Sequence, residues 1–335
     1  GVRVFTASSS QGILYGLEAL ATVAGWRVPL VLVNVSRALA TPITLEPDHN
    51  DVLSLRDTGI LQLHAETCQE VLDYILIAYR LAEDPEVALP VLVNLDGFYL
   101  SFTREPVELP DPEEVKKFLP DFKPSQPVFD GSRPMARASA VFGGGNYSYF
   151  KFQHHLAALH AETVFNKAAK EFGERFGRMY GPVERFRLED AEYVFIMSNS
   201  FATKGKAAVE QLRREGIKAG LLKLSLIRPF PKETIAEALA HRPKVAVIDQ
   251  NIAPGMGGIL YPEIMKAVYN RPDRPQHLLS VIGGLGGRNI SESDFAHIVV
   301  RLDQPVSDEP LMLFDENDRK QIEKLRQLAG VVQEA

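Results

Sequence analysis

The stretch Val28-Pro29-Leu30-Val31-Leu32-Val33-Asn34-Val35 is an almost unbroken apolar run. A strand that is apolar on both faces is typical of a parallel sheet covered by helices on both sides. A second such run lies at 90–95, and between the two runs residues 69–82 place apolar side chains at helical spacing. This alternation of strand, helix and strand predicts an α/β fold with a doubly wound parallel sheet.

The residues before this stretch extend the same pattern. Residues 2–6 predict a short strand, a Ser-rich loop follows, and residues 13–25 have the apolar spacing of a helix. Residues 36–59 are polar and predict an irregular segment. Because the chain starts with Gly1 and enters a strand at once, we expect the first domain to be incomplete at its amino end.

A change of composition follows the first strands and helices. Residues 102–134 are rich in Pro, Asp, Glu and Lys, which predicts an extended linker on the surface. Residues 150–180 then predict a long polar helix, with many Lys, Glu and Arg residues in its second half. We therefore place the first domain, with this linker and helix, at residues 1–188.

The second half alternates strands and helices again. We expect a second α/β domain at residues 189–335, with a four- to five-stranded parallel sheet and a charged helix over 316–328 near its end. Its predicted strands are 193–197, 218–224, 244–249 and 278–282, and its predicted helices are 203–215, 233–240, 258–269 and 292–302.

Composition excludes several classes of protein. The 335 residues carry a net charge of −6, which argues against a nucleic-acid binder, since phosphate contacts need clustered Lys and Arg. The single cysteine, Cys68, excludes an intrachain disulfide, a cysteine-ligated zinc site and an iron–sulfur cluster with four cysteine ligands in this chain. No apolar run is long enough for a membrane helix, so we expect a cytoplasmic protein with no nucleic-acid or membrane partner.

Two segments lie where ligands bind in open α/β sheets, at the carboxyl ends of strands. The loop Ser8-Ser9-Ser10-Gln11-Gly12 follows the first strand, and its serines could contact a ligand or cap a helix. Arg37 follows the second strand, and its planar guanidinium could bind a carboxylate through two hydrogen bonds. A surface or ion-paired arginine is the alternative for Arg37.

Other polar and glycine-rich segments allow more than one interpretation. The loop Asp48-His49-Asn50-Asp51 could suggest a metal site, but its spacing fits none, which favours a hydrogen-bonded loop. Two glycine clusters, 255–258 and 283–287, favour tight turns, while an anion-binding role stays open. His154 and His155 have no ligand spacing, and we expect them to be structural.

The order of these motifs resembles one family. Residues 5–12, 36–42, 48–51, 57–59 and 96–98 resemble the alpha subunit of pyruvate:ferredoxin oxidoreductase and related 2-oxoacid:ferredoxin oxidoreductases. In the second half, the segments at 227–231, 254–258 and 284–287 are similar to the second domain of that family. The resemblance implies a thiamine-diphosphate-binding, pyrimidine-type domain followed by a domain like the carboxyl-terminal domain of transketolase.

The resemblance also implies a reaction and its cofactors. The family converts a 2-oxoacid and coenzyme A to an acyl-CoA and CO2 and reduces ferredoxin. Thiamine diphosphate would be shared with a beta subunit that holds Mg2+, while [4Fe-4S] clusters would lie on partner subunits, among them a gamma and a ferredoxin-like delta subunit. No metal would be bound by this chain.

The same resemblance assigns roles to residues of the two loops. Arg37 would pair with the substrate carboxylate, and His49 and Asp51 would line the substrate side of the cleft. The residues near the aminopyrimidine of thiamine diphosphate would be Ser8, Ser9, Ser10 and Gln11. A Thr and a Glu of the family site would precede Gly1, so this chain alone is not expected to activate the cofactor.

The sequence leaves alternatives in place. Ala38, Leu39 and Thr41 would form a small lining that suits the methyl group of pyruvate, whereas 2-oxoglutarate, a branched-chain 2-oxoacid or oxalate are alternative substrates. A scaffold subunit without catalytic activity is another possibility. An unrelated nucleotide-binding dehydrogenase is disfavoured, because no Gly-x-Gly-x-x-Gly precedes a suitably spaced acid.

Overall fold

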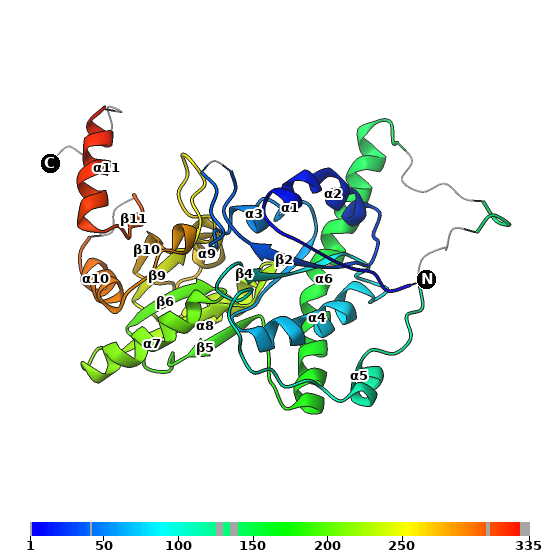
Figure 1. Cartoon of the computed structure of the whole chain (residues 1–335), viewed down its shortest axis with the longest axis horizontal. Coiled ribbons are helices and arrows are strands. Elements are labelled where there is room, and N and C mark those ends of the chain that lie inside the picture. The colour runs from blue at the N-terminus through cyan, green and yellow to red at the C-terminus, as the bar shows by residue number, and fades with distance from the viewer. Residues whose placement is uncertain (1, 41, 125–129, 135–139, 306–308, 329–335) are drawn as a thin grey trace.

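The protein contains two β-sheets, each covered by helices (Figure 1). The structure is a computed structural model that describes residues 2–40, 42–124, 130–134, 140–305 and 309–328. The first sheet has five strands in the order β1-β2-β4-β3-β8. These strands are β1 (Phe5–Ser8), β2 (Val31–Ser36), β3 (Leu61–His64), β4 (Val91–Asp96) and β8 (Leu226–Arg228).

Both faces of the first sheet are buried. In β2, Val31 and Val33 pack toward α4 (Cys68–Ala82) and α6 (Gly144–Phe176), while Leu32 packs on the opposite side, toward α1 (Gln11–Tyr15) and α2 (Leu17–Gly25). This alternation explains why β2 is apolar along its whole length. Strands β1, β2, β4 and β3 are parallel, so the doubly wound sheet expected from the sequence is confirmed.

The second sheet has six strands in the order β11-β10-β9-β6-β7-β5. Helices α7 and α10 pack on one face, and α8 and α9 pack on the other. Its strands are β5 (Val183–Phe186), β6 (Tyr193–Ser198), β7 (Ala219–Leu224), β9 (Lys244–Asp249), β10 (His277–Ile282) and β11 (Leu311–Met312). Its helices are α7 (Phe201–Arg214), α8 (Lys232–Leu239), α9 (Leu260–Val268) and α10 (Glu292–Leu302).

The two halves of the chain exchange a strand. Strand β8 follows β7 in the chain, yet it pairs antiparallel with β3 of the first sheet. Strand β5 precedes residue 188 and pairs antiparallel with β7 of the second sheet. The division of the chain at residue 188 therefore stays a prediction. One strand on each side of this residue, β5 before it and β8 after it, belongs to the sheet of the other half.

The structure corrects several predicted boundaries. The first strand is Phe5–Ser8 rather than 2–6, and the long helix α6 begins at Gly144 and ends at Phe176. The next residue, Gly177, has a φ of 76°, the left-handed conformation that stops a helix. The sheet of the second half has six strands, one antiparallel, because β5 and β11 extend it at its edges. The helix predicted at 316–328 is confirmed as α11 (Glu316–Leu328).

The segment predicted as a surface linker also contributes to the core. It contains α5 (Pro112–Phe118), which starts with Asp111 as a cap and Pro112 in the first turn. Phe118 is fully buried and packs edge-on against Phe172 of α6. Asp111 and Pro112, two of the residues that suggested a linker, therefore begin a short helix.

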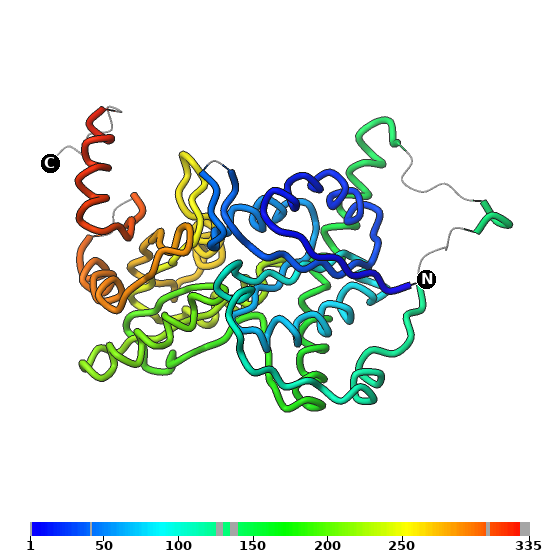
Figure 2. The backbone as a smooth tube through the Cα atoms, viewed as in Figure 1, coloured from blue at the N-terminus to red at the C-terminus, as the bar shows by residue number. Residues whose placement is uncertain are grey.

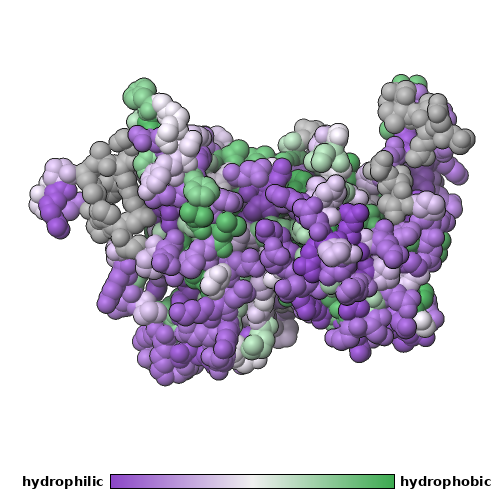
Figure 3. Space-filling view, turned by 180° about the vertical axis from the view of Figure 1, so that it is seen from behind, coloured by the Kyte–Doolittle hydropathy of each residue, from purple (hydrophilic) through white to green (hydrophobic). Residues whose placement is uncertain are grey.

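The chain runs from one end of the molecule to the other. The blue segment that contains β1 and the red helix α11 lie far apart along the long axis (Figure 2). The face opposite to that of Figure 1 is mostly hydrophilic, with hydrophobic residues gathered in separate clusters (Figure 3). Among the described residues, no helix combines the length and the apolar character needed to cross a membrane.

Candidate active site

Polar side chains gather where β1, β2 and β4 end, and we call this group the polar edge. Open α/β sheets bind ligands at this position because the loops that follow parallel strands converge there. The site residues predicted from the sequence lie on these loops, together with two strand-end residues that were not singled out. The polar edge consists of Ser8, Ser9, Ser10, Gln11, Ser36, Arg37, His49, Asp51 and Asp96.

Asp51 connects the loops of the polar edge. Its carboxylate is fully buried and accepts hydrogen bonds from the backbone N–H of Ser10 at 3.1 Å and of Arg37 at 3.3 Å. It also accepts from the hydroxyl of Ser36 at 2.7 Å and the amide of Asn34 at 3.2 Å. Burial raises the pKa of Asp51, whereas these hydrogen bonds act in the opposite direction. Its oxygens are directed at the protein, so Asp51 positions the loops.

Arg37 is half-buried and held by a single side-chain hydrogen bond. Its Nε donates to the hydroxyl of Ser9 at 2.9 Å, and that hydroxyl donates to the carbonyl of Val35 at 2.7 Å. Within the described part of the chain, Arg37 forms no ion pair with a carboxylate. The terminal nitrogens of the guanidinium are therefore available to a carboxylate from outside the chain.

The Ser-rich loop begins at the end of β1 and leads into α1. Ser8 is the last residue of β1, and the hydroxyl of Ser10 donates to the carbonyl of Ala38 at 2.7 Å. Ser10 has a φ of 48°, a left-handed backbone conformation that is uncommon for a serine. Gln11 starts α1, and its side-chain nitrogen is buried without a hydrogen-bond partner. A buried donor of this kind is rare and fits a ligand that supplies an acceptor.

His49 lies beside Asp96 at the point where the two sheets meet. Its Nε2 lies 2.8 Å from a carboxylate oxygen of Asp96, whose other oxygen accepts from the backbone N–H of Ser200 at 2.9 Å. Burial opposes a charge on His49, but the neighbouring carboxylates, with Asp96 foremost, outweigh it and raise the pKa of His49. Asp96 belongs to the motif at 96–98 that carries the family resemblance, but it was not predicted as a site residue, although its place at the end of β4 is a signal for it.

A second buried histidine borders the same region. The ring of His64 lies 5.8 Å from that of His49, centroid to centroid, and both of its nitrogens lack a hydrogen-bond partner. Burial and the nearby His49 hold the pKa of His64 well below its usual value, so this imidazole is neutral. The side chain of Asn199 is also buried without a partner.

One acidic cluster in the described residues has the spacing of a metal site. It consists of Glu66, Glu70 and Glu184, and it lies between the two sheets. The Nζ of Lys223 lies 3.1 Å from both Glu66 and Glu184 and also contacts Glu70. Lys206 adds a second ammonium group, 2.7 Å from Glu66. Lysines therefore supply the positive charge that these carboxylates require.

The glycine clusters of the second half form close contacts. The Asp249 carboxylate accepts from the backbone N–H of Leu260 at 2.7 Å, and it lies where a side chain on Gly258 would have to fit. Burial raises the pKa of Asp249 to about 7. In the other cluster, the carbonyl of Gly287 accepts from the hydroxyl of Tyr99 at 2.6 Å. Tight turns and close packing thus account for both of these positions.

Comparison with known proteins places the chain in a family. Residues 1–173 match the model of the pyruvate flavodoxin/ferredoxin oxidoreductase, thiamine-diphosphate-binding domain, and residues 191–295 match the pyruvate:ferredoxin oxidoreductase core domain II. The chain therefore belongs to the pyruvate:ferredoxin oxidoreductase family, as the sequence motifs indicated. Within it, the chain corresponds to the alpha subunit, an oxidoreductase subunit that acts within a complex.

Several relatives are similar over most of their length. The pyruvate synthase subunit PorA of Methanothermobacter thermautotrophicus is 40% identical over 91% of this chain and 78% of the relative. The PorA subunit of Thermotoga maritima is 42% identical over 87% of this chain and 74% of the relative. The ketoisovalerate oxidoreductase subunit VorA of Pyrococcus horikoshii is 41% identical over 88% of this chain and 74% of the relative.

A solved structure shares the fold. A 2-oxoglutarate:ferredoxin oxidoreductase from Magnetococcus marinus superposes with a TM-score of 0.60 at 16% identity, over 91% of this chain and 54% of that chain. The expected α/β fold class is thereby confirmed, with a domain that matches the thiamine-diphosphate-binding family model followed by a second α/β domain. The likeness of that second domain to the carboxyl-terminal domain of transketolase stays a prediction.

Proposed function

We propose that the chain is the alpha subunit of an enzyme that converts pyruvate, coenzyme A and oxidised ferredoxin to acetyl-CoA, CO2 and reduced ferredoxin. The observation that carries this proposal is the position of Arg37, whose guanidinium has no carboxylate partner in the described residues and lies at the carboxyl edge of the sheet. Arg37 would bind the carboxylate of the 2-oxoacid and orient the 2-oxo carbon toward the cofactor.

The residues of the polar edge fit thiamine diphosphate. Gln11 offers a buried donor without a partner, which suits a ring nitrogen of the aminopyrimidine. The hydroxyls of Ser9 and Ser10 already donate to backbone carbonyls, so these serines would shape the site rather than bind the ring directly. When bound, the cofactor supplies the carbanion-stabilising chemistry that loss of CO2 requires. His49 and Asp51 would support the substrate side of the cleft.

The substrate would be small. Ala38 and Leu39 follow Arg37 and offer a short lining for a methyl group, while Thr41, predicted to share this role, lies outside the described residues. Two of the relatives compared above are pyruvate synthase subunits, and a third is named for ketoisovalerate. A branched-chain 2-oxoacid is therefore the second candidate substrate.

The remaining components would come from partner subunits. A beta subunit would hold the diphosphate with Mg2+, and [4Fe-4S] clusters would lie on partner subunits, among them a gamma and a ferredoxin-like delta subunit. Ferredoxin would accept the electrons. Coenzyme A would accept the acyl group. The complex would act in the cytoplasm.

The test is reduction of a viologen dye by the complex that co-purifies with this chain under anaerobic conditions. With coenzyme A and thiamine diphosphate present, we expect pyruvate to support faster reduction than 2-oxoisovalerate, 2-oxoglutarate or oxalate. The variant Arg37→Ala is expected to lower kcat/KM for pyruvate about 100-fold or more, because the carboxylate loses its bidentate partner. Thiamine diphosphate binding should remain.

Arg185→Ala, at an exposed position of β5, is the matched control and should leave kcat/KM unchanged. An unchanged kcat/KM in Arg37→Ala would remove Arg37 from the substrate site. If the intact complex reduced the dye with none of the four acids, the chain would instead be a scaffold subunit.

A further inference from the structure

A large cavity lies apart from the polar edge, between the two sheets. It has a volume of about 680 Å³ and is formed by the segment 56–61, by α6, by the segment after β8 and by α9. Pockets of 300–1,000 Å³ are typical of sites for small molecules and cofactors. The cavity is thus of a size to hold such a ligand.

The cavity carries an excess of positive charge. Arg56 pairs with Asp57 at 3.5 Å, and Arg228 pairs with Glu263 at 2.6 Å, so these two arginines are neutralised. Lys151 of α6 and Lys266 of α9 also line the cavity, and within the residues that the structure describes neither forms an ion pair. In a protein with a net charge of −6, two such lysines on facing elements mark a site for an anion.

His154 adds a donor to the same cavity. It lines the cavity, and its Nε2 is buried without a hydrogen-bond partner. Gly59 has a φ of 93°, and a Cβ there would lie 2.2 Å from the His154 ring, so the glycine leaves room for the imidazole. Burial, with the positive charges of Arg27 and Lys151, lowers the pKa of His154.

Part of the wall is apolar. Ile60, Leu159 and the ring of Phe230 line the cavity beside the lysines. Phe230 is half-buried, so one part of its ring faces the cavity and another contacts the core. An aromatic wall beside unpaired lysines suits a ligand that joins a flat ring to a phosphate group.

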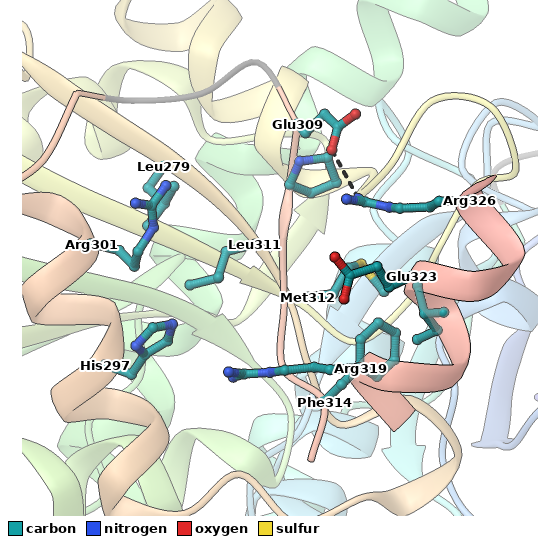
Figure 4. Close-up of a pocket in the computed structure, with 12 residues that line it drawn as sticks. Leu279, His297, Arg301, Glu309, Leu311, Met312, Phe314, Arg319, Glu323 and Arg326 are labelled. Atoms are coloured by element: carbon teal, nitrogen blue, oxygen red, sulfur yellow. Dashed lines mark hydrogen bonds and ion pairs between the residues drawn. The ribbon is translucent and has the colours of Figure 1, made fainter. Parts of the chain in front are cut away.

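A second cavity has a charge that is less favourable for binding an anion. It has a volume of about 370 Å³ and lies between α10 and α11, where Arg301 lines it and Arg319 extends toward His297 (Figure 4). Glu309 and Glu323 line it as well, and Arg326 pairs with Glu309 at 2.9 Å. Its positive charge is therefore partly balanced by the carboxylates of the chain itself.

The larger cavity lies at the opposite edge of the first sheet from Arg37. Leu61 lines the cavity and is the first residue of β3, whereas His64 is its last residue and lies beside His49. A strand rises about 3.3 Å per residue, so the length of β3, on the order of 10 Å, separates the two places. A ligand in the cavity would not reach the reacting atoms.

From this arrangement we infer that the cavity between segment 56–61, α6 and α9 is a peripheral site for a nucleotide, with Lys151, Lys266 and His154 contacting the phosphates and Phe230 contacting the base. The site is independent of the proposed reaction. Its occupant would take no part in the reaction and would not be consumed.

The test is calorimetric titration of the intact complex, saturated with thiamine diphosphate, with ADP and with pyrophosphate. We expect ADP to bind more tightly than pyrophosphate, because only ADP has a base. The double variant Lys151→Glu/Lys266→Glu should lose one ADP per chain or bind it at least about tenfold more weakly. Viologen reduction by this variant should stay at the wild-type level, which separates the site from the proposed reaction.

Two further variants make the result specific. Lys170→Glu/Lys320→Glu reverses two exposed lysines outside the cavity and should bind ADP like the wild type. Phe230→Ala should weaken ADP binding while pyrophosphate binding, which reports a folded site, is kept. The inference is wrong if the wild-type complex does not bind ADP, if both double variants bind it equally, or if Phe230→Ala leaves the affinity for ADP unchanged.

Discussion

His49 and Asp96 form a buried pair in which the imidazole Nε2 lies 2.8 Å from the carboxylate and the side chains are 2% and 0% exposed. The pair connects the two halves of the chain, because Asp96 also accepts from Ser200 and the backbone N–H of His49 donates to the carbonyl of Gln250. A buried carboxylate needs such partners to remain charged. The polar edge is thus closed on one side by the second sheet.

The raised pKa of His49 predicts how stability depends on pH. A histidine whose pKa is higher in the folded than in the unfolded protein stabilises the fold when it is protonated. This stabilisation is complete at pH values below the pKa of the unfolded state, about 6.5. It is lost as the pH rises through the pKa of the folded state. His49→Gln should therefore lower the melting temperature more at pH 6 than at pH 9, as measured by thermal denaturation. The exposed His155→Gln is the control. An equal loss at both pH values would contradict a charged His49.

Replacing Asp51 tests whether one carboxylate holds the loops of the polar edge. Asp51→Asn puts an NH2 group where N–H donors point, and we expect the free energy of unfolding to fall by about 3 kcal/mol in urea denaturation. Asp57→Asn, at an exposed carboxylate on the same segment, should change it by less than about 0.5 kcal/mol. Equal effects of the two variants would show that Asp51 is not the connecting residue.

Lys223 is expected to stabilise the junction of the two sheets. Lys223→Met keeps the apolar stem but leaves Glu66, Glu70 and Glu184 without the central ammonium, so the free energy of unfolding should fall by about 3–5 kcal/mol at pH 8. The loss should be smaller at pH 5, where the carboxylates can take up protons. Urea denaturation at both pH values measures this. Lys218→Met, which breaks only an exposed pair with Glu192, is the control.

The parts of the fold that could be predicted are those with a continuous apolar signal. Strands β2 and β4 are buried on both faces, and their sequences are correspondingly apolar throughout. Strand β3 is buried equally, but Gln62 and His64 alternate with its leucines, so the sequence suggested no strand. Strand β8 has only three residues, and it is a strand because it pairs with β3. The local sequence contains no pattern that predicts this pairing.

The candidate site was predictable in part for a similar reason. Arg37 and the Ser-rich loop follow strands, and this position is visible in the sequence. Asp51 was expected to line the substrate side of the cleft, and that role stays a prediction. Its oxygens accept hydrogen bonds from the surrounding loops, a property that depends on how those loops fold. Asp96 became apparent only through its contacts with His49 and Ser200, which are distant in the sequence.

The exchanged strand β8 has a consequence for how the protein unfolds. Without β8, the strand β3 would become a bare edge with unpaired N–H and C=O groups, which invites association with other chains. Neither half therefore has a complete sheet on its own, and the two halves are expected to form and melt as a single cooperative unit. If the backbone were cleaved between the two halves, we expect the two pieces to stay associated through the pairing of β8 with β3.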